Sequence, residues 1–159
     1  SDWQRIVSSP LQRCHAFAVA LGERRQLPVE SDARFAEVGF GAWEGRTRSE
    51  LEQRVPGQVG RFLSDPIIHR PPGAEPLDAF VARVQAGFDE LVAASAGQSV
   101  LVVAHAGVIR AILVRVLEIP PQAMYRINVA NAGITEIRTN RERGFSLYSH
   151  GPVRGEVIR

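Results

Sequence analysis

Three stretches of this sequence carry side chains that could bind a phosphate group and move a proton. The first is the segment Ser8–Arg13, in which Ser9 suits the cap of a helix and Pro10 its first position. Gln12 stands where a capping-box side chain reaches back to the cap. Arg13 would then lie in the first helical turn, beside unpaired backbone N–H groups, where its guanidinium suits a phosphate. Taken alone, an arginine in this position is more often a solvated surface residue.

The second stretch joins an apolar run to a histidine. Residues 100–104 read Val-Leu-Val-Val-Ala, which is typical of a central strand covered on both faces. His105 follows directly, and a helix over Val108–Leu117 would complete a strand–turn–helix unit. Open α/β sheets bind ligands beyond the carboxyl ends of their strands, which is where His105 and Arg13 would both lie. By itself, His105 is equally well explained as a hydrogen-bonded core residue.

The third stretch is the glycine-punctuated loop Glu37–Gly45. Gly39 and Gly41 have no side chains, so this loop can approach a ligand closely. In a pocket that also holds an arginine and a histidine, a carboxylate can give a proton to a leaving oxygen or take one from an entering oxygen. We rank Glu37 first for this role. The alternatives are that Glu37 forms a surface salt bridge, or that Glu44 is the functional acid.

The elements that would position these residues alternate strand and helix. The predicted strands cover residues 5–8, 27–29, 100–104, 133–138 and 145–149. The predicted helices cover residues 10–21, 47–63 with an interruption at Pro56-Gly57, 77–97 and 108–117. The residues expected to be buried on the first helix are Leu11, Cys14, Phe17, Ala18 and Leu21. This order predicts an α/β fold, a three-layer sandwich with a mostly parallel central sheet flanked by helices.

The size and composition of the chain indicate one domain and exclude several functions. A length of 159 residues with 45% hydrophobic composition fits a single domain over residues 1–159. The sequence shows no long apolar run and no leader, so we expect a cytoplasmic protein without membrane contact. All of its basic residues other than histidine are arginine, which excludes Schiff-base chemistry and a phosphate-loop lysine. The net charge of +2 is spread along the chain, which does not favour nucleic-acid binding.

The metal-binding and thiol residues are few and scattered. Four histidines and one cysteine stand without paired spacing, so we predict no metal site and no cofactor. Cys14 cannot form an internal disulfide, and its place on the buried stripe of the first helix favours a core thiol. A cysteine-dependent phosphatase would need an arginine six residues after the cysteine, but Ala20 occupies that position.

Four motifs stand in order along nearly the whole chain. They are Ser9-Pro10-Leu11-Gln12-Arg13, Glu37-x-x-Phe40-Gly41-x-Trp43-Glu44-Gly45, Pro72-Gly73-Ala74-Glu75 and Val102-Val103-Ala104-His105-Ala106-Gly107-Val108-Ile109-Arg110. Together they resemble the histidine phosphatase superfamily, also called phosphoglycerate-mutase-like. The Trp43-Glu44-Gly45 form and the Arg13-Cys14 pair resemble the alpha-ribazole phosphatase branch, which belongs to cobalamin biosynthesis, more than the true mutases.

This resemblance implies a role for each candidate residue. Arg13 would bind the transferred phosphoryl group, together with His105 and Ala106. Glu37 would protonate the leaving oxygen, and His105 would stabilise charge on the equatorial oxygens. The substrate would be a small-molecule phosphate ester, hydrolysed through a phosphohistidine intermediate without a metal.

The most specific motif of that superfamily, an arginine-histidine-glycine tripeptide on its first strand, does not occur in this sequence. The histidine of that motif is the nucleophile, and the nearest string here, Ser149-His150-Gly151, reads as a strand end. We therefore expect an N-terminally truncated domain that lacks its first strand and has almost no activity by itself. The sheet edges left open would invite another chain to pair, for example in a homodimer.

Three functions remain open at this point. The leading hypothesis is a phosphomonoester hydrolase. The second is a non-catalytic fragment, or pseudo-phosphatase, that keeps the anion pocket and binds phosphorylated ligands. The third is a phosphoglycerate mutase, which the length disfavours because mutases carry longer insertions to keep water from the phosphoryl group.

Overall fold

Three short parallel strands form the sheet that carries the candidate site. The structure, a computed structural model, describes residues 2–140, 142 and 144–152, so Ser1 and residues 153–159 of the predicted domain lie outside the described part. The strands are β1 (Arg5–Ser8), β2 (Val29–Ser31) and β3 (Val100–Val103), in the order β2–β1–β3. Because β1 lies in the middle, the ends of β1 and β3 are neighbours at one edge of the sheet.

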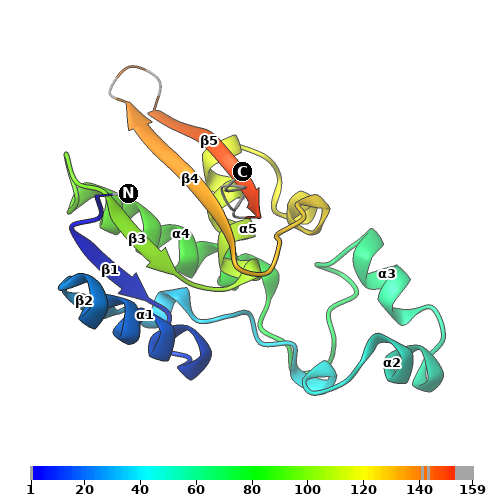
Figure 1. The fold of residues 1–159 in the computed structure, drawn as a ribbon. Coiled ribbons are helices and arrows are strands. Elements are labelled where there is room, and N and C mark those ends of the chain that lie inside the picture. The colour runs from blue at the N-terminus through cyan, green and yellow to red at the C-terminus, as the bar shows by residue number, and fades with distance from the viewer. Residues whose placement is uncertain (1, 141, 143, 153–159) are drawn as a thin grey trace, which may run out of the picture.

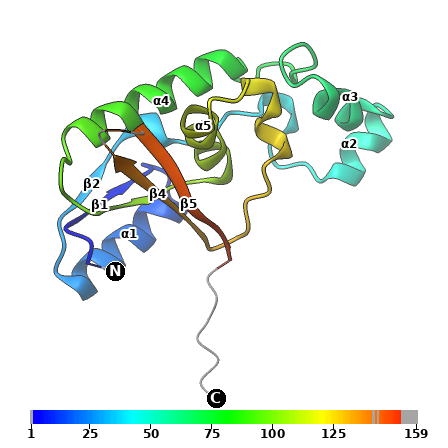
Figure 2. The same cartoon turned by 90° about the horizontal axis from the view of Figure 1, so that it is seen from above.

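Helices cover both faces of this sheet (Figures 1 and 2). Helix α1 (Gln12–Arg25) lies on one face, and α4 (Leu77–Ala93) and α5 (Ala106–Leu117) lie on the other. The main core forms where α4 and α5 meet the sheet, around the fully buried side chains of Phe80 and Val108. The predicted α/β fold with a parallel sheet between helices is confirmed. Among the described residues, no helix has both the length and the apolar character needed to cross a bilayer.

The last two strands form a hairpin of their own. β4 (Gly133–Asn140) and β5 (Gly144–Pro152) pair antiparallel, with a register shift between Glu136 and Ile137. The hairpin packs on the helical layer, where the Phe145 and Phe88 rings lie 5.2 Å apart. The prediction that these strands are present is correct, but they do not extend the parallel sheet. Among the described strands, none pairs with the outer edge of β3 or with the edge of β4 opposite β5.

A pair of short helices projects at one end of the molecule (Figure 1). Helix α2 (Arg48–Arg54) begins with a capping box in which Thr47 and Glu50 bond each other's backbone N–H groups. Helix α3 (Gln58–Ser64) starts after Gly57, whose φ of 76° breaks the helical path. The predicted interruption at Pro56-Gly57 is therefore confirmed. The short 3-10 helices η1 (Ala33–Phe35), η2 (Gly41–Trp43) and η3 (Pro121–Arg126) lie in the connecting loops.

Helix α1 departs from its predicted start and end. The helix begins at Gln12 rather than Pro10, and no side chain caps it, so the predicted capping box is wrong. The Ser9 hydroxyl instead accepts a hydrogen bond from the Leu11 N–H at 3.2 Å, which turns the chain between strand and helix. The helix continues through Gly22 to Arg25. The residue that caps it, Gln26, adopts the left-handed conformation that is usually found in glycine.

Two predictions of burial were also wrong. Phe17 is 57% exposed, because the buried stripe of α1 follows Cys14, Ala18 and Gly22 at a spacing of four, and Phe17 falls beside it. The segment 100–104 was predicted to be a fully covered central strand, but β3 lies at the edge of its sheet and its residues are only partly buried. A continuous apolar run does not by itself distinguish a central strand from an edge strand.

A side chain on α4 holds the loop that leads to Glu37. Arg83 forms an ion pair with Glu75, with N···O distances of 2.6 and 2.8 Å. The same guanidinium donates to the carbonyl oxygens of Arg34 at 2.7 Å and Ala36 at 2.9 Å. It also lies 4.8 Å from the centre of the Phe80 ring. Arg83 thus ties the 34–37 loop and the segment around Glu75 to the same helix.

We expect Arg83→Gln to lower the free energy of unfolding by about 2 kcal/mol, because it leaves a partly buried carboxylate and two carbonyl groups without their donor. Urea unfolding followed by circular dichroism measures this. The matched control is Arg138→Gln, which removes an exposed ion pair with Glu136 and should change stability by less than about 0.5 kcal/mol. Equal effects of the two substitutions would contradict the role given to Arg83.

Candidate active site

The carboxyl ends of β1 and β3 bring Ser9 and His105 together. The Ser9 N–H donates to the Val103 carbonyl oxygen at 2.9 Å, which continues the strand pairing one step past the end of β1. His105 is the N-cap of α5 and is only 7% exposed. Its Nε2 atom shares a hydrogen bond of 2.7 Å with the Ser9 hydroxyl. The parallel register thereby fixes the orientation of the imidazole ring.

Cys14 packs against the same ring from α1. Its Sγ atom lies 3.6 Å from both ring nitrogens of His105 and donates to the Ala104 carbonyl oxygen at 3.3 Å. Burial raises the pKa of this thiol, although the nearby Arg13 charge opposes the shift. The thiol therefore remains protonated, which agrees with the predicted core cysteine.

Arg13 reaches the site from the first turn of α1. Its side chain is exposed, and its positive charge lowers the pKa of His105, an effect that adds to the larger one of burial. Arg13 immediately precedes Cys14, which packs on the His105 ring, so the helical turn that carries Arg13 lies beside His105. Arg13 also lies at the N-terminal end of α1, where backbone N–H groups without helical partners attract an anion.

Glu37 enters the same cluster from the loop after η1. One of its carboxylate oxygens accepts a hydrogen bond from the Gly107 N–H at 3.2 Å, and the other accepts one from its own neighbour, Val38, at 2.9 Å. A Cβ atom at position 107 would overlap the Glu37 carboxylate, so only glycine allows this approach. The negative charge of Glu37 acts on His105 and partly opposes the lowering of its pKa.

The backbone of α5 adds donors to this cluster. Ala106 is the first residue of α5, so its N–H has no partner within the helix. The first turns of α1 and α5 thus bring the Arg13 cation and the Ala106 backbone N–H to the corner where His105 and the Glu37 carboxylate lie. Such an arrangement can bind a phosphoryl group and exchange a proton with one of its oxygens.

Glu44 takes a different position from Glu37. Its exposed carboxylate accepts a hydrogen bond from the Phe40 N–H at 3.1 Å and so closes the turn of its own loop. The glycines of this loop approach a neighbouring segment. Gly41, with a φ of 53°, lies directly against the backbone of Pro72 to Ala74, and the Gly39 carbonyl accepts from the Glu75 N–H at 2.9 Å. Their close contact is therefore with the protein itself.

Sequence reasoning missed the residues that position this cluster. Ser9 was interpreted only as a helix cap, yet it bonds His105. Gly107 was part of a motif without an assigned purpose, although its missing side chain makes room for Glu37. Arg83 gave no signal at all except its place on the polar side of a strongly amphipathic helix. The described residues contain no group of three histidine, cysteine or acidic side chains that could hold a metal ion.

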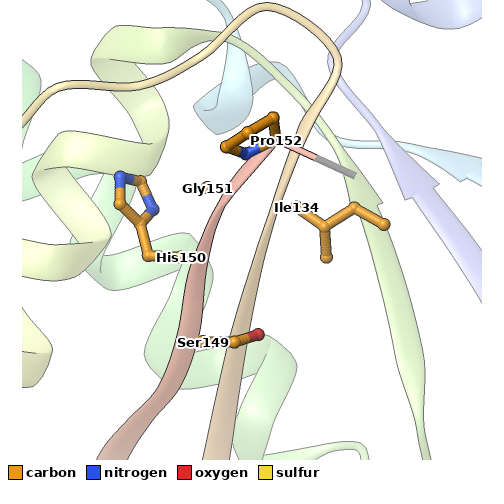
Figure 3. Close-up of a pocket in the computed structure, with 5 residues that line it drawn as sticks. All are labelled: Ile134, Ser149, His150, Gly151 and Pro152. Atoms are coloured by element: carbon orange, nitrogen blue, oxygen red, sulfur yellow. The ribbon is translucent and has the colours of Figure 1, made fainter. Parts of the chain in front are cut away.

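A cavity of about 540 Å³ lies elsewhere, against the end of the β4–β5 hairpin (Figure 3). Its lining includes Ile134 and His150, whose side chains project from opposite sides of the hairpin. Both ring nitrogens of His150 are engaged, by the Thr135 hydroxyl at 2.7 Å and the Asn128 carbonyl oxygen at 2.6 Å. The contact with Asn128 ties β5 to the loop before β4, whereas the contact with Thr135 lies within the hairpin. Arg13, Glu37 and His105 do not line this cavity.

Comparison with known proteins gives consistent matches. The profile of the histidine phosphatase superfamily, branch 1, matches residues 1–150. A bifunctional protein of Mycobacterium tuberculosis is 37% identical over 130 residues, which are 82% of this chain but 35% of that protein. This chain thus spans about a third of the length of that relative. Phosphoserine phosphatase 1 of Hydrogenobacter thermophilus is 27% identical over 142 residues, covering 89% of this chain and 67% of that protein.

Solved structures with the same fold include two phosphatases. The complex of a mycobacterial glucosyl-3-phosphoglycerate phosphatase with inorganic phosphate has a TM-score of 0.81 at 30% identity, covering 93% of this chain and 76% of that one. The alpha-ribazole phosphatase of Shigella flexneri has a TM-score of 0.79 at 26% identity, covering 94% of this chain and 73% of that one. The relatives and neighbours named here are therefore phosphatases or a bifunctional protein.

We expect Gly107→Ala to push the Glu37 carboxylate away from α5 and to strengthen the binding of inorganic phosphate, because a negative charge then lies further from the anion. The fold should persist, because the closest displaced group is the end of a flexible side chain, although the new Cβ atom also comes within 3.3 Å of the Phe80 ring. Isothermal titration calorimetry measures the affinity, and circular dichroism measures the fold. Gly60→Ala is the matched control, since a Cβ atom there meets only open space. Unchanged phosphate affinity in Gly107→Ala would show that Glu37 does not shape the anion site.

Stability should fall as the pH drops below the ordinary histidine pKa of about 6.5. The pKa of His105 is lowered in the folded protein by burial and by Arg13, with Glu37 opposing, while Cys14 beside it stays neutral. The unfolded chain therefore binds a proton before the folded chain does, and unfolding becomes easier until His105 itself is protonated. In His105→Gln, we expect the free energy of unfolding, measured with urea, to lose this dependence on pH between about pH 7 and about pH 5. If the free energy of unfolding changed with pH equally in the unsubstituted protein and in His105→Gln, His105 would not be the source of the pH dependence.

Proposed function

The chain belongs to the histidine phosphatase superfamily, and we propose that the cluster around His105 is the phosphoryl-transfer site of a phosphomonoester hydrolase. One observation carries this proposal: at the joined ends of β1 and β3, Cys14 beside Arg13 packs on the buried His105 ring, and Glu37 accepts a hydrogen bond from Gly107, two residues after that histidine. Relatives and neighbours named as phosphatases support the same class of reaction.

The proposed roles follow from the chemistry of each group. Arg13 holds two phosphoryl oxygens with its guanidinium, and the Ala106 N–H holds a third. His105, held by Ser9 and packed against Cys14, stabilises the charge on the phosphoryl oxygens. Glu37 gives its proton to the leaving oxygen as the bond to phosphorus breaks, and then takes a proton from the attacking water.

The nucleophile of the proposed reaction is a second histidine. By resemblance to the superfamily, it would stand in an arginine-histidine-glycine motif on a further strand. This sequence does not contain that motif. We propose that such a strand pairs with the open edge of β3, because that edge ends at His105 and pairs with no described strand. A longer form of this polypeptide, or a second chain as in a homodimer, would supply it. The described part alone would then have almost no activity.

The substrate in this proposal is a small phosphate ester in the cytoplasm. The alpha-ribazole phosphatase branch is the finer hypothesis, supported by the likeness to the Shigella flexneri enzyme and by the Arg13-Cys14 and Trp43-Glu44-Gly45 motifs. A second candidate function is phosphate-ligand binding without turnover. It is favoured by the same cluster, because the cation, the ring and the N–H group suffice to bind an oxyanion.

Titration of the chain with inorganic phosphate tests the proposed site. We expect Arg13→Gln to weaken binding about tenfold, as for the loss of a charged hydrogen bond, while Arg24→Gln at the exposed far end of α1 leaves binding unchanged. An affinity that does not depend on Arg13 would refute the site.

The reaction is tested with the chain extended to include the arginine-histidine-glycine strand. We expect it to release phosphate from an aryl phosphate, and Glu37→Gln to slow turnover about a hundredfold or more. Phosphate binding without any turnover by the extended chain would favour the binding function instead.

A further inference from the structure

Two arginines from distant parts of the chain meet at Tyr125, in η3. Arg70 donates a hydrogen bond from a terminal nitrogen to the Tyr125 hydroxyl, with an N···O distance of 3.2 Å. The guanidinium of Arg110 lies 5.8 Å from the centre of the Tyr125 ring. Arg110 stands three residues after Gly107, whose N–H bonds Glu37, so this arm of the group lies one helical turn from the proposed acid. This group is called the Tyr125 cluster below.

The Arg110 side chain extends the proposed phosphoryl site along α5. Residues three or four apart share a face of a helix, so Arg110 lies on the same face as Ala106 and Gly107, one turn further on. Gly107 bonds Glu37 with its N–H, as described above. Arg110 is fixed there because its Nε atom donates to the Ile127 carbonyl oxygen at 2.9 Å. Its terminal nitrogens are not used by that bond.

Arg70 is held from the other side by the loop between α3 and α4. Its Nε and one terminal nitrogen donate to the Glu75 carbonyl oxygen at 3.0 and 2.6 Å. The guanidinium also lies between two aromatic rings, 5.6 Å from the centre of Phe40 and 5.8 Å from that of Phe62. The Phe62 ring also packs on Tyr125, with ring centres 4.9 Å apart, so one aromatic ring contacts both Arg70 and Tyr125.

The positive charge of the Tyr125 cluster has no carboxylate partner within the described part of the chain. Five other arginines form ion pairs there, yet neither Arg70 nor Arg110 does, although both are partly buried. Partial burial makes an unpaired charge costly, because the group loses water without gaining an opposite charge. Two such charges around one phenol therefore favour an anionic ligand.

We propose that the Tyr125 cluster binds a second oxyanion, a carboxylate or phosphate carried by the leaving group of the ester. This inference rests on the proposed function, since it takes the phosphoryl group to lie at Arg13 and His105. The leaving oxygen then faces Glu37, and the rest of the leaving group extends along α5 to Arg110 and Arg70. The cluster therefore contacts the leaving group and determines which esters bind, and it does not contact the transferred phosphoryl group.

The chemistry of the cluster fits that role. Guanidinium groups bind oxyanions with paired N–H donors, and two of them can share one ligand. Burial raises the pKa of Tyr125, although the arginines oppose it, so its hydroxyl remains a donor at neutral pH. A neutral hydroxyl on the leaving group would leave these donors poorly matched, which is how a polar site rejects the wrong ligand.

Matched ligands test this inference by calorimetry on the full chain. O-phosphoserine differs from phosphoethanolamine only by a carboxylate, and glycerol bisphosphate differs from glycerol phosphate by a second phosphoryl group. We expect the added anion in at least one pair to improve affinity about tenfold, and Arg110→Gln to abolish that gain. The pair that responds identifies the anion. Tyr125→Phe, which keeps the ring, should reduce the gain, and the exposed Arg126→Gln should retain it.

Three results decide the fate of this inference and separate it from that of the proposed function. If inorganic phosphate binds through Arg13 but neither added anion improves affinity, the proposed function stands and the Tyr125 cluster is not a ligand site. A gain that survives in both Arg110→Gln and Tyr125→Phe also overturns the inference. If inorganic phosphate does not bind through Arg13, the proposed function fails, and this inference fails with it.

Discussion

The parallel pairing of β1 with β3 is the constraint on which the candidate site depends. The two strands are joined in register from Arg5 and Val100 to Ser8 and Val103, and their ends therefore reach the same level. Ser9, one residue past β1, bonds His105, two residues past β3, and α1 and α5 start from the same edge. A slip of one residue would turn the side chains to opposite faces of the sheet and separate this pair.

A second set of contacts positions Glu37, which comes from a loop rather than from a strand. Arg83 fixes the carbonyl groups just before it, and Glu75 orients Arg83. Gly107 then lets the carboxylate lie directly on the first turn of α5. Each of these contacts is made to a backbone group or to a residue on α4 or α5. The position of the flexible Glu37 side chain is therefore fixed relative to these two helices.

Much of this architecture could be predicted from the sequence, because periodicity and glycine positions report local structure directly. The amphipathic pattern from Leu77 to Val92 and the break at Gly57 both correspond to observed elements. Arg13 and His105 could be placed at one edge of the sheet because each follows a predicted strand. Glu37 comes from a loop, whose position relative to that edge no local pattern reports, so its role rested on its chemistry and on the resemblance to a family. The exposure of Phe17, the edge position of β3 and the antiparallel hairpin depend on tertiary packing, which no local pattern encodes.

The exclusive use of arginine among the strong bases bears on how the site responds to acidity. Guanidinium groups keep their charge throughout the range in which proteins stay folded. The cations at Arg13, Arg70 and Arg110 therefore form a permanent electrostatic background, while burial and the Arg13 charge lower the pKa of His105. Near neutrality, the protonation of the phosphate monoester itself, whose second ionisation falls in that range, would then set how strongly these cations hold it.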